Sequence, residues 1–126
     1  MPVSNQHSEN DFINQLTEQL SRQDNWKVEK EPNGGSADLL IEDTNSGKRI
    51  FIEFKERGQY GELPISSILS LDKQKSQLSV NDTLFPVTFS GISALLKAKL
   101  KDLGIRAFAK PSVEDMVGNV QYAMSA

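Results

Sequence analysis

The N-terminal part of the chain has the apolar spacing of an amphipathic helix. Its apolar residues recur at intervals of three or four positions: Phe12, Ile13, Leu16 and Leu20. This spacing places them on one face of a helix that runs to about Arg22. Ser8 is followed three residues later by Asp11, which resembles a capping box and predicts the start of the helix there.

The next segments alternate in the manner of strands. Trp26 and Val28 alternate with charged residues, a pattern typical of a short, half-exposed strand. Residues 37–42 and 49–55 are richer in β-branched and aromatic side chains and predict two stronger strands. The segment between them, DTNSG, has turn chemistry, so these two strands should form an antiparallel hairpin.

Helices and strands also alternate in the second half. Residues 56–70 predict an ordered functional loop with a short helical turn at residues 65–69. The expected elements after it are a polar helix at about residues 71–79, a strand at residues 84–89, an amphipathic helix with Ile92, Leu95, Leu96, Leu100 and Leu103 that closes at Gly104, a strand at residues 105–110, and a last helix capped by Ser112. Pro86 cannot donate to a ladder, which predicts an edge strand or a bulge at that position.

The resulting order, αβββαβαβα, predicts an α/β fold with one small mixed sheet of about five strands and helices on its faces. At 126 residues the chain should be a single domain, with residues 1–7 as a flexible N-terminus. It has no cysteine, which excludes disulfides and zinc-thiolate clusters. No apolar run approaches the about 20 residues of a membrane span, and no signal peptide is recognisable. We therefore expect a cytoplasmic protein.

Charge is distributed unevenly along the chain. The net charge is −3, which by itself argues against a nucleic-acid partner. Residues 1–44 carry three basic and nine acidic groups, whereas residues 45–110 carry eleven basic and six acidic groups. This asymmetry is a hint of a polyanionic partner, although charges that only solvate the surface explain it equally well.

The predicted hairpin brings charged groups together. Strand parity places Ile50, Ile52 and Phe54 on the core-facing side, and Glu53 and Lys55 on the opposite side.

The position of Asp38 depends on the register of the hairpin. If opposed residue numbers sum to 91, Asp38 lies across from Glu53, and if they sum to 93, it opposes Lys55. Either register gathers all three side chains on one face. A hairpin centred on Ser46 would separate them unless a bulge intervenes.

Two opposed carboxylates repel each other, so something must offset their charge. Lys55 could do so, or a divalent cation held by Asp38, Glu53 and the backbone carbonyl of Phe54, an oxygen set that suits Mg²⁺. Such an ion activates water and polarises a phosphodiester, while the Lys55 ammonium orients or deprotonates the attacking water. The alternative is a surface salt-bridge cluster without chemistry.

This combination of residues resembles the PD-(D/E)xK nuclease superfamily. The pattern reads Ala37-Asp38, fourteen further residues, then Glu53-Phe54-Lys55, with Ala37 in place of the usual proline. Within the superfamily the chain is most similar in pattern to archaeal-type Holliday-junction resolvases. These also begin with a helix that bears a glutamate, matched by Glu9, and have a Gly/Ser-rich segment before the aspartate, matched by residues 34–36.

The resemblance implies a restriction-endonuclease-like fold and a Mg²⁺-dependent DNA endonuclease, with Mn²⁺ able to substitute. It also implies a homodimer and selectivity for junctions or branched DNA. Glu9 would assist at the metal, with Glu18 as the competing candidate, and Gln74 or Gln77 would support the site.

Several other side chains are candidate contacts to nucleic acid. Arg57, Lys73 and Lys75 follow the site in sequence and are expected to contact phosphates, and Tyr60 to stack on an unpaired base. The lysines at 97, 99 and 101 are expected to be the solvent side of a helix.

Two alternative functions stay open. One is a non-catalytic nucleic-acid-binding or assembly module on the same fold, against which the intact carboxylates argue. The other is an RNA-directed or toxin nuclease that uses the same site, because the metal chemistry is common to DNA and RNA cleavage.

Overall fold

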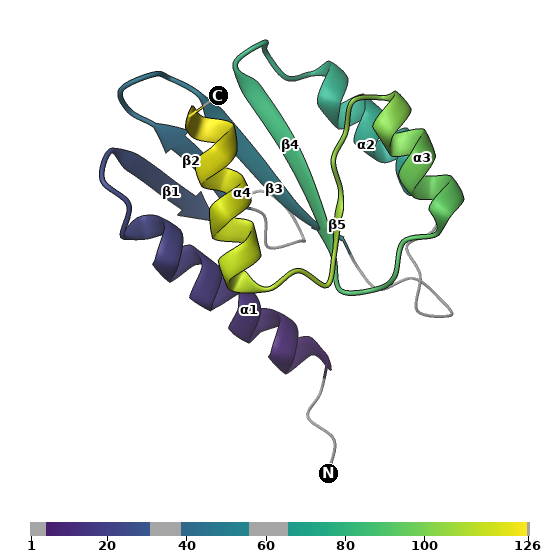
Figure 1. The fold of residues 1–126 in the computed structure, drawn as a ribbon, viewed down its shortest axis with the longest axis horizontal. Coiled ribbons are helices and arrows are strands. Elements are labelled where there is room, and N and C mark those ends of the chain that lie inside the picture. Colours follow the sequence, from purple (N-terminus) through teal and green to yellow (C-terminus); the bar gives the residue numbers. More distant parts are fainter. Residues whose placement is uncertain (1–4, 31–38, 56–65, 126) are drawn as a thin grey trace.

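A computed structural model describes residues 5–30, 39–55 and 66–125. The elements are α1 (Asn5–Ser21), β1 (Trp26–Lys30), β2 (Leu39–Asp43), β3 (Arg49–Lys55), α2 (Ser67–Ser76), β4 (Asp82–Thr88), α3 (Ala94–Asp102), β5 (Phe108–Ala109) and α4 (Val113–Ser125) (Figure 1). Their order is the predicted αβββαβαβα. The predicted α/β class, a mixed five-stranded sheet flanked by helices, is confirmed.

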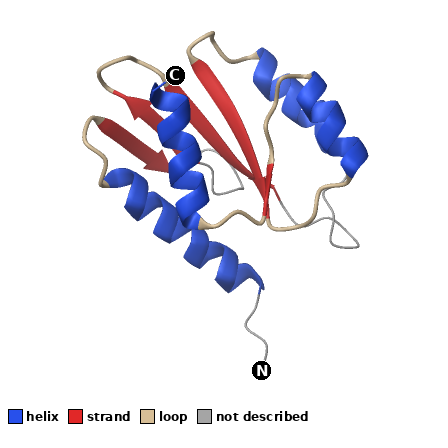
Figure 2. Ribbon diagram, viewed as in Figure 1, coloured by secondary structure: helices blue, strands red, loops and turns tan. Residues whose placement is uncertain are grey.

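The strands form one sheet in the order β1-β2-β3-β4-β5 (Figure 2). The first three strands pair antiparallel, whereas β3 pairs parallel with β4, and β4 parallel with β5. Because parallel strands point the same way, the carboxyl ends of β3, β4 and β5 meet at one edge of the sheet. We call this the carboxyl edge.

The hairpin of β2 and β3 adopts one of the two predicted registers. Leu39 pairs with Ile52, and Ile41 with Ile50, so the paired numbers sum to 91. The turn between the strands is closed by Gly47, whose N–H donates to the Asp43 carbonyl at 2.8 Å and whose φ is +76°. That left-handed conformation is the one in which glycine has no steric penalty.

Helices cover both faces of the sheet. α1 and α4 pack against each other on one face, and α2 packs against α3 and β4 on the other. The α1/α4 side buries the larger core cluster, which includes Leu16, Leu20, Ile41, Ile50, Ile52, Phe54, Met116 and Val120. The α2/α3 side buries a smaller cluster of Leu71, Leu84, Leu96, Leu100 and Ile105. The predicted parity of β3 is therefore confirmed.

The predicted N-terminal boundary is wrong. α1 begins at Asn5, so Ser8 lies inside the helix and does not cap it. Residues 5–7 likewise belong to the helix, although the sequence predicted a flexible tail there. The physical reason is that polar residues such as Asn5 and Gln6 are compatible with a helix. The prediction relied on apolar spacing, which these residues lack.

The boundaries of α2 and β5 also differ from prediction. α2 runs over Ser67–Ser76 as one helix that joins the predicted helical turn to the predicted polar helix. The remainder of the predicted loop, residues 56–65, lies outside the described residues. β5 is two residues long rather than six, and Lys110 after it has a φ of +49°, which turns the backbone out of the strand.

Pro86 lies in a strand that is second from the edge of the sheet. It pairs with Glu53 of β3 on one side, while on the other side β5 pairs only with Val87 and Thr88. The prediction of an edge is thus correct for Pro86 itself and wrong for β4 as a whole. Because β5 does not extend to Pro86, no strand on that side needs a hydrogen bond from the N–H that proline lacks.

The last two helices are capped as their sequences indicate. Ser93 Oγ accepts from the Leu96 N–H at 3.1 Å, and Ser112 Oγ accepts from the Asp115 N–H at 3.0 Å. Leu95, predicted on the apolar face of α3, is 58% exposed, because Leu96 and Leu100 occupy the buried face. The apolar stripe of α4 is part of the core: Met116, Val120 and Met124 are buried.

None of the helices in the described ranges is both long enough and apolar enough to cross a membrane.

Candidate active site

The carboxyl edge collects the ends of three strands. Lys55, the last residue of β3, pairs with Thr88, the last residue of β4, which pairs with Ala109 of β5. Lys110 follows directly, and its N–H donates to the Thr88 carbonyl at 2.8 Å. Two of the predicted site residues, Glu53 and Lys55, therefore lie in β3 at this edge.

Glu53 lies on the α2/α3 side of the sheet. It alternates with the buried Ile52 and Phe54 of the other face and is itself only half-buried. Phe51, two residues earlier on the same side, packs against the smaller core cluster. The strand thus fixes the carboxylate beyond the edge of that cluster, where it keeps access to solvent.

Three predicted site residues cannot be placed. Asp38, Arg57 and Tyr60 lie outside the described residues. Within the described ranges, no three carboxylate or histidine side chains gather closely enough to hold a metal ion. Of the predicted metal ligands, these ranges contain Glu53, the Phe54 carbonyl and Glu9.

Three phenylalanines fix the start of α1 against the carboxyl edge. Phe12 packs edge-on against Phe89 with ring centroids 5.5 Å apart, and against Phe54 at 6.5 Å. Phe54 and Phe89 stack with centroids 6.1 Å apart. The sequence identified Phe12 and Phe54 as core residues, but it could not show that they meet, because that contact depends on how α1 crosses the sheet.

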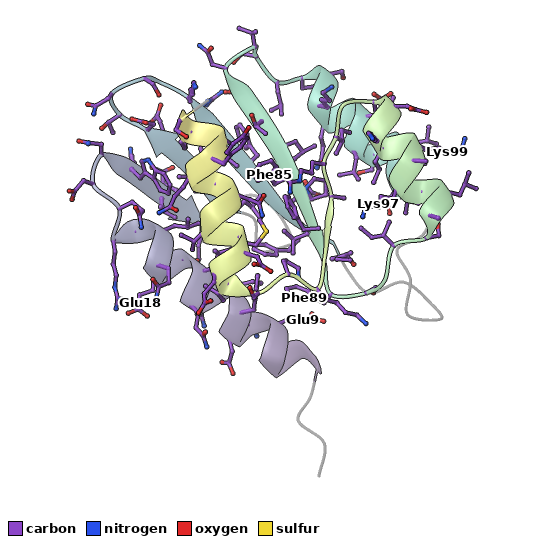
Figure 3. The ribbon with its side chains drawn as sticks, viewed as in Figure 1. Glu9, Glu18, Phe85, Phe89, Lys97 and Lys99 are labelled. Carbon is purple, nitrogen blue, oxygen red and sulfur yellow. The ribbon has the colours of Figure 1, made fainter. Side chains whose placement is uncertain are left out.

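This packing separates the two competing glutamates. Glu9 is half-buried and lies one turn before Phe12, whose ring contacts Phe89 directly after β4; Glu9 and Phe89 are labelled in Figure 3. Glu18 lies toward the other end of α1, where its 63% exposed side chain pairs with Arg22. The structure therefore brings Glu9, and not Glu18, to the carboxyl edge.

The two candidate glutamines lie toward the opposite edge. Gln77 is the C-cap residue of α2, and Ser79 shortly after it donates its N–H to Asp82, the first residue of β4, at 3.1 Å. Gln74 is one turn earlier; its Oε1 is buried and accepts no hydrogen bond from the described part of the chain. The structure does not bring either glutamine to the carboxyl edge.

The two lysines of α2 differ in their surroundings. The Lys75 ammonium donates to the Leu103 carbonyl at the C-terminus of α3, so it joins α2 to α3. Lys73 is exposed and forms no ion pair within the described ranges. Only Lys73 therefore keeps its ammonium available for a phosphate.

A carboxylate with a shifted pKa, Asp82, lies at the amino end of the parallel strands. Asp82 receives Arg49 Nε at 2.9 Å on Oδ1 and Arg49 Nη2 at 2.8 Å on Oδ2. These hydrogen bonds lower the pKa of Asp82 and raise the pKa of Arg49. Because Arg49 and Asp82 are directly paired across β3 and β4, the ion pair holds the two strands in register rather than serving the carboxyl edge.

Two cations near the edge were not among the predicted site residues. Arg106 places its guanidinium over the Phe108 ring at 5.0 Å, and Lys110 follows β5 at the carboxyl edge. The sequence contained both residues next to its last predicted strand. It did not show that this strand runs parallel to β3 and β4, which is what brings Lys110 to the same edge.

Comparisons with known proteins support the fold. No family model matches the sequence, and no curated protein matches it. Among solved structures, the MspJI restriction endonuclease in complex with a 27-mer oligonucleotide is similar with a TM-score of 0.51 and 9% identity, over 87% of this chain and 27% of that one.

Two further structures match over most of this chain. A repair endonuclease from Pyrococcus abyssi gives a TM-score of 0.49 and 18% identity, over 89% of this chain and 48% of that one. EndoMS in its apo form gives a TM-score of 0.47 and 19% identity, over 89% of this chain and 48% of that one. This chain spans less than half the length of each of the three proteins. At such identities the likeness concerns the fold alone, which is restriction-endonuclease-like.

Proposed function

We propose that this chain is a metal-dependent DNA endonuclease that hydrolyses phosphodiester bonds at the carboxyl edge. The observation that carries the proposal is the position of Glu53 and Lys55 at the end of β3, with Glu53 on the face opposite Ile52 and Phe54. A half-buried carboxylate can hold a metal ion, and a lysine two residues later in the strand can supply positive charge for phosphodiester hydrolysis. The restriction-endonuclease-like fold supports the same proposal.

The second carboxylate of the proposed site is Asp38. The register of β2 and β3 sums to 91, so the number opposite Glu53 is 38, and Asp38 directly precedes β2 in the sequence. Opposed carboxylates need a cation between them. We assign Mg²⁺, which Mn²⁺ can replace, to Asp38, Glu53 and the Phe54 carbonyl. This all-oxygen donor set suits these ions and lacks the sulfur and imidazole ligands that softer metals prefer.

Each side chain has a distinct role in this proposal. When held by Asp38, Glu53 and the Phe54 carbonyl, the ion would supply electrostatic stabilisation of the phosphoryl oxygens and would lower the pKa of a water molecule. Lys55 orients the attacking water and holds positive charge next to the reacting phosphate. Glu9 reaches the same edge from α1 and assists in holding the ion, while Lys73 contacts a phosphate outside the reacting centre.

The finer properties of the substrate follow from the same proposal. Cutting both strands of a duplex or a junction needs two active sites, so we propose that the protein acts as a homodimer on DNA, including branched DNA. The α4 stripe is part of the core, and the dimer contact therefore has to lie elsewhere.

A cleavage assay tests the proposal. The protein is incubated with plasmid, single-stranded DNA, four-way junctions and RNA, each with Mg²⁺, Mn²⁺ or EDTA. We expect metal-dependent cleavage of at least one DNA substrate, and a loss of about 100-fold or more in Glu53→Gln and in Asp38→Ala. Absence of cleavage on every substrate, or full activity in either variant, contradicts the proposed mechanism. Cleavage of RNA alone would identify the RNA-directed alternative.

A matched pair of variants tests the role of Glu9. Glu9→Gln should lower the rate of cleavage and raise the Mg²⁺ concentration needed for half-maximal activity, by about 10-fold each, because one oxygen ligand loses its charge. Glu18→Gln makes the same chemical change on the same helix, away from the carboxyl edge, and should cleave like the wild type. Equal effects of the two substitutions would remove Glu9 from the site.

A further inference from the structure

A groove of about 360 Å³ lies between α3 and the segment that leads into β5. Its rim is formed by Lys97 and Lys101 of α3 and by Arg106, and its floor includes Leu100 and Ile105. None of these residues belongs to the proposed active site. The groove therefore combines three cations with an apolar floor at a separate place on the molecule.

The three cations of the groove form no ion pair with any residue that the structure describes. Lys97, Lys101 and Arg106 are exposed, and none takes part in an ion pair within the described ranges. None of the described carboxylates lines the groove, and Asp102, next to Lys101 in sequence, is not among its lining residues. The groove is thus ready for an anionic ligand without first breaking an internal pair.

Two of the three lysines of α3 line the groove, because of their spacing on the helix. Lys97 and Lys101 are four residues apart and so lie on the same side of the helix, one turn from each other. Lys99 lies on the other side, as Figure 3 shows for Lys97 and Lys99. Arg106 is held in place by its contact over the Phe108 ring. Three cationic side chains, those of Lys97, Lys101 and Arg106, therefore line one groove.

The floor of the groove is formed by core residues. Leu100 is 1% exposed and Ile105 is 4% exposed, and both belong to the smaller core cluster. A sugar-phosphate backbone alternates anionic phosphates with apolar sugar edges. An apolar floor below a cationic rim complements that alternation better than it complements a uniformly polar anion.

The charge of the whole α2/α3 layer agrees with an anionic partner. α2 and α3 together carry five lysines and two aspartates, whereas α1 and α4 together carry five acidic residues and no lysine or arginine. The uneven charge along the sequence therefore becomes a difference between the two sides of the sheet. The groove lies on the basic side, which is also the side of Glu53.

The groove is connected to the carboxyl edge by the chain itself. The segment that lines it leads into β5, and Lys110 directly follows β5 at that edge. From Ile105 to Lys110 the chain spans at most about 17 Å, its length when fully extended. At about 3.4 Å of helix axis per nucleotide of one strand, the groove lies within about five nucleotides of the carboxyl edge.

We propose that the groove binds the phosphate backbone of the DNA substrate, with phosphates on Lys97, Lys101 and Arg106 and sugars on the apolar floor. The inference rests on the proposed function for its choice of DNA as the ligand. In it, the three cations are positioning residues that hold the substrate while the carboxyl edge does the chemistry.

A binding experiment tests this separately from cleavage. Fluorescence anisotropy with a labelled 30-base-pair duplex in EDTA measures the Kd over a range of salt concentrations, for Lys97→Ala, Lys101→Ala, Arg106→Ala and the control Lys99→Ala. Each groove substitution should weaken binding about fivefold or more at 0.1 M salt and lower the slope of log K against log salt by about 0.9. Lys99→Ala makes the same change of charge on the same helix and should leave both within twofold of the wild type.

The outcomes distinguish this inference from the proposed function. One outcome is that the protein cleaves DNA in Mg²⁺ while the groove variants bind like the wild type, or are weakened no more than Lys99→Ala. This outcome contradicts DNA binding by the groove and supports the nuclease function. If the groove substitutions weaken DNA binding but the protein cleaves no substrate, DNA binding by the groove is supported and the nuclease function is contradicted. If the wild type binds no duplex in EDTA, or if an acidic peptide and not DNA loses affinity in the groove variants, DNA is not the ligand of the groove.

Discussion

The carboxylate of Asp82 shows how much a single residue can decide in this sheet. Its side chain is 2% exposed and is satisfied by two Arg49 hydrogen bonds and the Ser79 N–H. Removing either partner leaves a buried polar group without its counterpart, which costs more than a surface ion pair is worth.

Asp82→Asn should lower the free energy of unfolding at pH 7 by about 2 kcal/mol, because the neutral amide cannot accept both Arg49 hydrogen bonds as a carboxylate does. The pKa of Asp82 is lowered in the folded protein, so its contribution is fully present above its unfolded pKa of about 4 and is lost as the pH falls through the folded value. Urea unfolding of both proteins at pH 7 and below pH 4 measures this. A difference between them that does not shrink on acidification contradicts the assignment.

At the scale of residues, the sequence predicted on which face of the sheet a side chain lies, but not which side chain it pairs with. Parity placed Glu53 opposite Ile52 and Phe54, and the structure confirms it. The pairing of Arg49 with Asp82 could not be predicted, since it follows from a parallel register between β3 and β4 that the alternation of side chains does not specify.

At the scale of elements, the end of α3 depends on one glycine. Gly104 has a φ of +74°, its N–H donates to the Lys101 carbonyl at 2.9 Å, and the Ile105 N–H donates to the Leu100 carbonyl at 2.8 Å. This is a Schellman motif, which needs a left-handed residue. A Cβ at Gly104 would also lie 2.8 Å from Lys75 Nζ, the group that binds the Leu103 carbonyl.

Gly104→Ala should therefore destabilise the protein by about 2 kcal/mol, the sum of the left-handed backbone cost and the displacement of Lys75. Gly47→Ala is the matched control: its φ is +76°, but no atom lies within 4 Å of the added Cβ. It should cost about 1 kcal/mol. Denaturant unfolding of the two variants compares them, and equal losses would show that the contact with Lys75 contributes nothing.

The order of the elements was predictable from periodicity, and several of their limits were not. Gly104 marked the end of α3 because glycine is the residue that such a terminus favours. The length of β5 was overestimated, because the alternation of Ile105, Ala107 and Ala109 is compatible with a strand but does not create a partner for it. Strand length is set by pairing, which is a tertiary property.

For the whole molecule, the sequence predicted the fold class and part of the site. The αβββαβαβα order follows from local patterns and is confirmed, and the observed hairpin register is one of the two that the sequence left open. The groove beside α3 could not be predicted, because Lys97 and Arg106 meet only after α3 and β5 pack together. The lysines of α3 had been assigned to a solvated face, and sequence periodicity cannot distinguish such a face from one that lines a groove.

The division of charge between the two layers leads to a prediction at the same scale. Lys97→Ala/Lys101→Ala and Gln15→Glu/Gln121→Glu both change the net charge from −3 to −5, by two units in each case. The first pair lies on the basic side, whereas the residues of the second pair are exposed on α1 and α4. If net charge governed affinity for DNA, the two double variants would bind equally.

We expect them to differ by about tenfold at 0.15 M salt, with only the first double variant weakened. Electrostatic interactions between exposed charges are screened beyond about 8 Å at this ionic strength, so carboxylates added on the far layer do not reach DNA on the α2/α3 side. Anisotropy titrations of both variants against one duplex measure the difference, and thermal unfolding confirms that both are folded. Equal weakening would mean that the protein presents no preferred face to DNA, because binding would then respond to total charge and not to its position.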